Sequence, residues 1–117
     1  MLIGAAAIFL FNRSVDIRKG FEGLGQLVQE ELDEPLTSGA YFVFLNRRRD
    51  RMKVLYWDVD GLAIWYKRLE KGCFRPLCQG RISRRDFLML LEGVIPKRIQ
   101  RRYQLGNKCL EKGDKMG

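Results

Sequence analysis

Three apolar runs in the middle of the chain, separated by short polar segments, constrain the fold more than any other feature. They span 41–45, 53–57 and 62–69 and are rich in the aromatic and β-branched residues that favour strands. Segment 58–61 reads Asp-Val-Asp-Gly, and glycine after aspartate supplies the positive φ that tight hairpins need. We therefore expect an antiparallel meander. Whether its last loop has two or four residues stays open, and with it the face on which each aromatic side chain lies.

The segment before the meander predicts one strand and one helix. The apolar start of the chain predicts a buried strand at about Ile8–Phe11, and the apolar run is too short to span a bilayer, so we expect no membrane segment there. A single apolar stripe at helical spacing follows, with Asp16 placed as the N-terminal cap of the helix. The stripe consists of Ile17, Phe21, Leu24, Val28 and Leu32.

A second helix is expected after the meander. Ser83 and Asp86 have the spacing of a capping box, and the apolar stripe that follows ends near Pro96. Together these patterns predict a single α+β domain over 1–95, with an antiparallel sheet of three to four strands covered by one or two helices. Residues 96–117 lose apolar periodicity and are strongly basic, which predicts a flexible tail.

The charge of the chain favours an anionic partner. Its 22 basic and 14 acidic side chains give a net charge of +8 and a pI of about 9.8. Such a field attracts phosphates, and nucleic acid is the most common partner of basic domains.

The basic residues concentrate where the first two runs of the meander meet. Four arginines occupy five positions between 47 and 51, on a predicted loop where guanidinium groups fork readily onto phosphate oxygens. Further basic residues follow on the neighbouring strands. The candidate nucleic-acid-binding residues are Arg47, Arg48, Arg49, Arg51, Lys53, Lys67, Arg68, Lys71 and Arg75. A solvated turn is the alternative interpretation of this cluster.

Aromatic residues interleave with this charge. Trp57, Trp65 and Tyr66 are candidates for stacking on exposed bases or for contact with a partner. Tryptophans in the strands of a small domain more often fill the core, and that interpretation is favoured here.

Catalytic and metal-binding chemistry finds little support in the residues. Histidine is absent, and Cys73, Cys78 and Cys109 form no CxxC pair, so we expect neither a metal site nor another cofactor. Three unpaired thiols point to a reducing cytoplasm. Asp58, Asp60 and Glu70 are the carboxylates from which a magnesium nuclease would be built, but aspartates at a hairpin are more often turn residues. We therefore expect that the protein is not an enzyme.

At the level of whole segments the chain resembles a known family. VDIRKGFEGL, FVFLNRRRDRMKVLYWDVDGLAIWYKRLEKGCF and FLMLLEGV are similar to the TnpB-type accessory proteins, which the second open reading frame of the insertion-sequence sixty-six group of bacterial transposable elements encodes. The matching positions are Asp16, Arg18, Lys19, Gly20, Phe21, Asn46, Arg47, Arg48, Asp50, Lys53, Trp57, Asp58, Gly61, Tyr66, Lys67, Arg68, Leu69, Glu70 and Gly72.

The resemblance implies a non-catalytic accessory protein that assists a separate transposase in DNA transposition. Its implied partners are the transposase and the other accessory protein of the same element, and the basic loop adds DNA. The alternative is an adaptor that docks on the transposase without touching DNA. Exposed sheet edges make a homodimer a further expectation.

Overall fold

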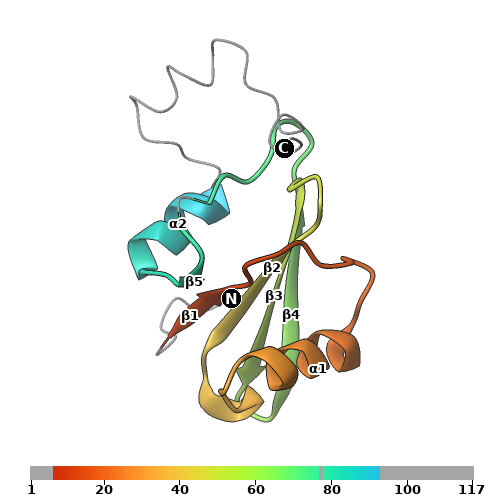
Figure 1. Ribbon diagram of the computed structural model, residues 1–117, viewed down its shortest axis with the longest axis vertical. Coiled ribbons are helices and arrows are strands. Elements are labelled where there is room, and N and C mark those ends of the chain that lie inside the picture. The colour runs from red at the N-terminus through yellow and green to blue at the C-terminus, as the bar shows by residue number, and fades with distance from the viewer. Residues whose placement is uncertain (1–6, 77, 93–117) are drawn as a thin grey trace.

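The computed structural model of the chain describes residues 7–76 and 78–92 and shows an α+β fold, as the sequence predicts (Figure 1). One five-stranded sheet has the order β4-β3-β2-β1-β5. The elements are β1 (Ile8–Leu10), α1 (Phe21–Glu31), the short 3₁₀ helix η1 (Leu36–Ser38), β2 (Tyr41–Leu45), β3 (Arg51–Asp58), β4 (Gly61–Arg68), β5 (Gly80–Arg81) and α2 (Arg84–Glu92).

The sheet is mixed, whereas the sequence predicts an antiparallel sheet of three to four strands. β2, β3 and β4 form the expected meander, but β1 pairs parallel with β2. Parallel neighbours need a crossover, and α1 supplies it between β1 and β2. The fifth strand, β5, pairs antiparallel with β1 and is not among the expected strands.

The β3–β4 hairpin has a two-residue loop, which settles the question that the sequence leaves open. Asp58 pairs with Gly61, so Val59 and Asp60 form the loop. Val59 adopts a φ of 58°, the left-handed conformation that a β-branched side chain rarely accepts. With this register, Trp57 lies on the α1 face of the sheet and Trp65 on the α2 face.

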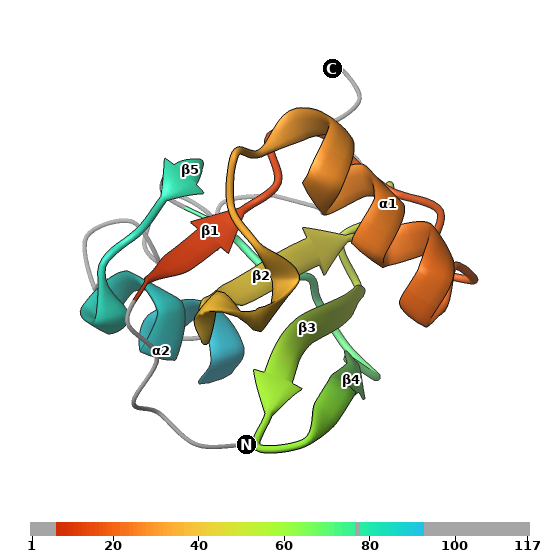
Figure 2. The same ribbon diagram turned by 90° about the horizontal axis from the view of Figure 1, so that it is seen from below.

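Each face of the sheet carries its own core, because α1 and α2 cover opposite faces (Figure 2). On one face, Leu24 and Val28 of α1 pack with Phe42 and Phe44 of β2. On the other face, Phe87 of α2 joins Tyr41, Val43, Val54 and Phe74, among others. β2 is buried along its whole length, which explains why its sequence is apolar at every position rather than alternating.

The first helix begins later than predicted. Gly20 is the residue before its first turn, and the expected cap Asp16 instead accepts the backbone N–H of Arg18 at 3.0 Å. The expectation for Asp16 is wrong because its short carboxylate closes a local turn that ends before the helix. Phe21, expected in the buried stripe, is 50% exposed at the helix start. Within α1, Leu24 and Val28 are the stripe residues that are buried.

The second helix begins as predicted. The Ser83 hydroxyl accepts the backbone N–H of Asp86 at 3.0 Å, which is the N-cap bond of the expected capping box. Phe87, Leu90 and Leu91 are its buried residues. The predicted end near Pro96 and the predicted tail over 96–117 lie outside the described residues, so the division of the chain at residue 95 stays a prediction.

Candidate nucleic-acid interface

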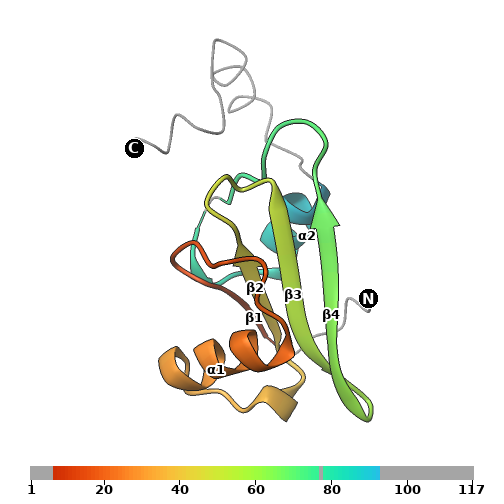
Figure 3. The same cartoon turned by 90° about the vertical axis from the view of Figure 1, so that its right-hand side faces the viewer.

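The arginine-rich loop between β2 and β3 is held by hydrogen bonds at both of its ends. The Asn46 amide donates to Asp50 at 2.7 Å, and its carbonyl oxygen accepts the Arg51 backbone N–H at 3.0 Å. The loop also accepts backbone N–H groups from the chain after β4, since Leu69 donates to Asp50 and Phe74 donates to Arg49. Figure 3 shows both segments at the same end of the sheet. The backbone that carries the arginines is therefore braced from two sides.

The positive charge of this loop is not neutralised from within. Asp50 is the only acid in the loop, and its carboxylate accepts from Asn46 rather than from an arginine. Arg47 and Arg48 are exposed, and Arg49 and Arg51 are partly buried. In the described part of the chain, the ion pairs are Arg13–Glu31, Arg18–Asp16 and Arg68–Glu70, and none involves the loop.

The register of β3 and β4 adds to this charge. Arg51 lies directly opposite Arg68, and Met52 lies opposite Lys67. Like charges directly opposite each other destabilise a sheet unless something neutralises them. Arg68 has Glu70 at 3.1 Å as a partner, whereas Arg51 has no ion pair among the described residues. The end of the hairpin thus carries repulsion that an added anion would relieve.

Two of the lysines predicted to bind DNA have hydrogen-bond partners within the fold. Lys53 donates to the Lys19 carbonyl at 2.8 Å and lies 5.0 Å from the Tyr66 ring centre. Lys67 donates to the Leu91 carbonyl of α2 at 2.8 Å. Both side chains therefore hold a helix or its leading turn to the sheet. Among the remaining candidates, Lys71 is exposed and Arg75 is partly buried.

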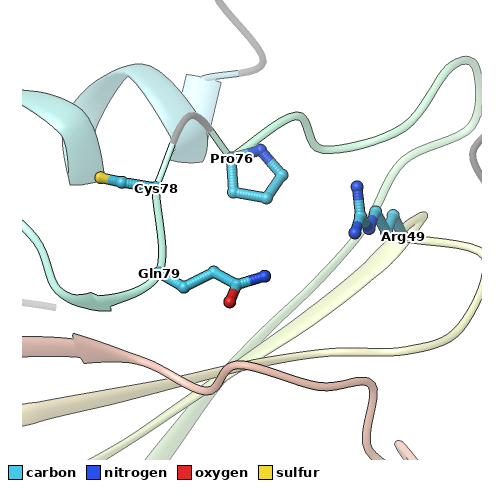
Figure 4. A pocket seen from close by; sticks show the side chains of 4 residues that line it. All are labelled: Arg49, Pro76, Cys78 and Gln79. Carbon is cyan, nitrogen blue, oxygen red and sulfur yellow. The ribbon is translucent and has the colours of Figure 1, made fainter.

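An open pocket of about 290 Å³ lies beside the loop and is lined by Arg49, Pro76, Cys78 and Gln79. Figure 4 shows the Gln79 amide extending toward the side of the pocket that Arg49 occupies. The Cys78 sulfur points away and donates to the Asp86 carboxylate at 3.5 Å. Desolvation, together with this bond, raises the pKa of the Cys78 thiol, so the thiol is a poor nucleophile. The pocket therefore offers hydrogen-bond donors rather than catalytic groups.

The candidate aromatic residues divide between core and surface. Trp65 is partly buried against the α2 core, as the favoured core interpretation predicts. Trp57 is partly buried and donates its indole N–H to the Val59 carbonyl at 3.2 Å. Tyr66 is 49% exposed on the α1 face, and the Lys53 ammonium lies over its ring.

The carboxylates considered for a magnesium nuclease are not brought together. Asp58 and Asp60 lie at the turn of the β3–β4 hairpin, and Glu70 follows the opposite end of β4. Within 7–76 and 78–92, no group of three potential ligands is placed to hold a metal ion. The same residues include no helix long and apolar enough to cross a membrane.

Most of the first group of family-pattern residues lies in the segment that leads into α1. Arg18 and Lys19 belong to the turn before α1, and the Lys19 carbonyl is the acceptor of Lys53. Asp16 holds this turn, and the bond from the Arg18 side chain lowers the pKa of its carboxyl to about 2. Gly20 precedes the helix without a side-chain cap. Of these positions, Lys19 connects the turn before α1 to the sheet through its carbonyl.

Sequence reasoning missed the support of the loop and the far wall of the pocket. Asn46 belongs to the family pattern, but its hydrogen bonds with Asp50 and Arg51 depend on the geometry of the turn. No sequence motif indicates that Pro76 and Gln79 line a pocket. The expectation of three unpaired thiols is wrong for Cys73, which is disulfide-bonded, while Cys78 is free and exposed.

Comparison with known proteins identifies the family. Residues 6–101 match the family described as "IS66 Orf2 like protein". The chain belongs to this family. Two similar proteins come from Sinorhizobium fredii (strain NBRC 101917 / NGR234): "Uncharacterized protein y4jC" is 34% identical over 81% of this chain and 85% of its own length, and "Uncharacterized protein y4hO" is 33% identical over 74% and 79%. No solved structure matches significantly.

Membership of the IS66 Orf2-like family confirms the resemblance that the sequence motifs indicate. It also supports an accessory role in transposition, because this is a family of accessory proteins of transposable elements.

Proposed function

We propose that this IS66 Orf2-like protein is a non-catalytic, cytoplasmic accessory factor of transposition that contacts DNA through its arginine-rich loop. The observation that carries the proposal is uncompensated charge on a braced backbone. Arg47 and Arg48 are exposed without ion pairs among the described residues, while Asn46 and Asp50 hold the loop that presents them. A rigid loop loses little conformational entropy when its arginines bind phosphate.

The contacts are expected to be mainly with phosphates. Guanidinium groups fork onto phosphate oxygens, and such contacts position a protein on DNA without reading its sequence. The repulsion between Arg51 and Arg68 is relieved when a phosphate lies between them. Arg49 and Gln79 offer further donors from the adjoining pocket.

The test compares two double variants in DNA-binding titrations at several salt concentrations. Arg47→Ala with Arg48→Ala removes two exposed loop charges, and Arg13→Ala with Arg18→Ala removes two charges that are paired with Glu31 and Asp16 elsewhere. The slope of log affinity against log salt falls by about 0.9 for each phosphate that the variant no longer neutralises. We expect this change only in the loop variant. Equal slopes for the loop variant and the parent chain contradict the proposal.

A second function, docking on the transposase, is favoured by a different observation. Among residues 7–76 and 78–92, the exposed large hydrophobic residues are Phe21 at 50%, Tyr66 at 49% and Val59 at 88%. Val59 stands at the hairpin turn, far from the arginine loop along the strands. The adaptor predicts that the purified transposase co-elutes with this chain without DNA, and that Val59→Asp abolishes the complex while DNA binding is retained. A homodimer is also part of the proposed assembly.

A further inference from the structure

Strand β4 is an open edge of the sheet. Among the described residues it pairs only with β3, and its residues 61–65 are all partly buried rather than fully covered. From Leu62 to Tyr66 the edge carries neither charge nor proline, two of the devices by which proteins protect edge strands. An unprotected edge of this length is a template for another strand.

The charges at the two ends of β4 indicate which strand it pairs with. Asp58 and Asp60 lie at one end and Lys67 and Arg68 at the other. A second copy running antiparallel brings the acidic end of each chain to the basic end of its partner. A parallel arrangement brings like charges together. We propose that the protein forms a twofold dimer in which β4 pairs antiparallel with β4 of a second copy, so that one sheet runs through both chains.

The register of this pairing follows from the faces of the strand. Residues opposite each other in a twofold antiparallel pair lie on the same face, so the axis passes through a residue. An axis at Ile64 places Asp60 opposite Arg68 of the second copy and pairs the strand from Gly61 to Lys67. An axis at Trp65 places Arg68 opposite Leu62, where it meets no acid. An axis at Ala63 leaves fewer residues paired.

The same register provides partners for the side chains of the edge. Leu62 lies opposite Tyr66 of the second copy on the α1 face, so the half-exposed Tyr66 ring gains an apolar neighbour. Trp65 lies opposite the small side chain of Ala63 on the α2 face. Aromatic and aliphatic cross-strand pairs of this kind stabilise sheets.

Net charge opposes the dimer over a longer range. Each chain carries +8, so two copies repel at low ionic strength. At about 0.15 M salt the screening length is about 8 Å, which weakens this repulsion more than it weakens the pairs in contact. The oligomeric state is therefore measured near that salt concentration, without DNA, so that its outcome is independent of the proposed DNA contacts.

The experiment is a charge exchange followed by sedimentation equilibrium of the full chain. Asp60→Lys alone and Arg68→Glu alone each place like charges opposite each other twice per dimer, and we expect each to raise the dimer dissociation constant about tenfold. The double variant restores opposite charges and should return to the parent value. Circular dichroism melting of each variant shows that the monomer fold is kept.

A crosslink tests the register directly. In a Cys78→Ser background, Ile64→Cys places two cysteines across the twofold axis, and mild oxidation should give a disulfide-linked dimer. Ala63→Cys, whose copies are offset along the strands, is the matched control and should crosslink poorly. A parent chain that remains monomeric at its highest soluble concentration overturns the proposal, and so does a double charge variant that dimerises no better than the single ones.

Discussion

The Asn46 side chain gives the sharpest test of how the arginine-rich loop is built. Asn46→Ala removes the bond to the Asp50 carboxylate at 2.7 Å and the acceptor of the Arg51 N–H at 3.0 Å. A net hydrogen bond contributes about 0.5 to 1.5 kcal/mol and one to a charged group about 1.5 to 3 kcal/mol. Because the site is only partly buried, we take the lower end and expect a loss of about 2 kcal/mol.

The assay is thermal unfolding followed by circular dichroism. For a domain of this size, about 2 kcal/mol corresponds to a fall in Tm of about 8 °C. Arg47→Ala is the control, since this exposed side chain has no ion pair among the described residues and its removal should change stability by less than about 0.5 kcal/mol. If the two variants have the same Tm, the reasoning about the Asn46 bridge is refuted.

The same variant separates charge from geometry in DNA binding. Asn46→Ala leaves the net charge at +8. It releases Asp50, which then competes with phosphate for the neighbouring arginines. A DNA affinity that falls at constant net charge supports a preorganised loop, whereas an unchanged affinity means that only the number of charges counts.

Two further predictions concern local geometry. Val59→Asn should stabilise the fold by about 1 kcal/mol in urea denaturation. A left-handed conformation costs a non-glycine residue roughly 1–2 kcal/mol, and asparagine accepts it more readily than valine. A destabilised variant contradicts the assignment of strain to this turn. The Asp16 carboxyl, with a pKa lowered from 3.8 to about 2 by Arg18, contributes stability that is present above pH 3.8 and lost as the pH falls through 2. Arg18→Gln should return the NMR-titrated pKa toward 3.8, and a pKa that stays near 2 would show that another group holds it.

The apolar pattern of the chain predicts the strands of the meander well, because the burial of each strand is reflected in its own residues. Tyr41–Leu45 is predicted with the correct bounds, since a strand covered on both faces is apolar throughout. The parallel pairing of β1 with β2 is not predictable in this way. It depends on the path that the chain takes through α1. The residues of β1 do not indicate which strand lies beside it or in which direction that strand runs.

The positive charge of the candidate interface was predictable from the sequence. Which of its basic side chains have hydrogen-bond partners within the fold was not. Sequence treats Lys53 and Lys67 like the loop arginines, yet each donates to a backbone carbonyl far away in the chain. Such partners belong to tertiary structure, because the acceptors are Lys19 and Leu91, distant in sequence. Asn46 occupies the carboxylate of Asp50, the one acid of the loop, and no loop arginine has an ion pair among the described residues.

The two proposals, taken together, have a geometric consequence for DNA. In the dimer centred on Ile64, the two Arg68 residues lie eight positions apart along the strand direction, which is about 26 Å at about 3.3 Å per residue. The arginine-rich loops lie beyond these ends, so their separation approaches the roughly 34 Å of one turn of B-form DNA. Two basic ends on one rigid sheet then contact the same duplex at once, and binding at the first end raises the effective concentration at the second. The acidic hairpin turns, which a duplex repels, are covered by the partner's basic ends in the same arrangement. Dimerisation through β4 therefore shields the acidic turns from the duplex and presents two arginine-rich loops to it.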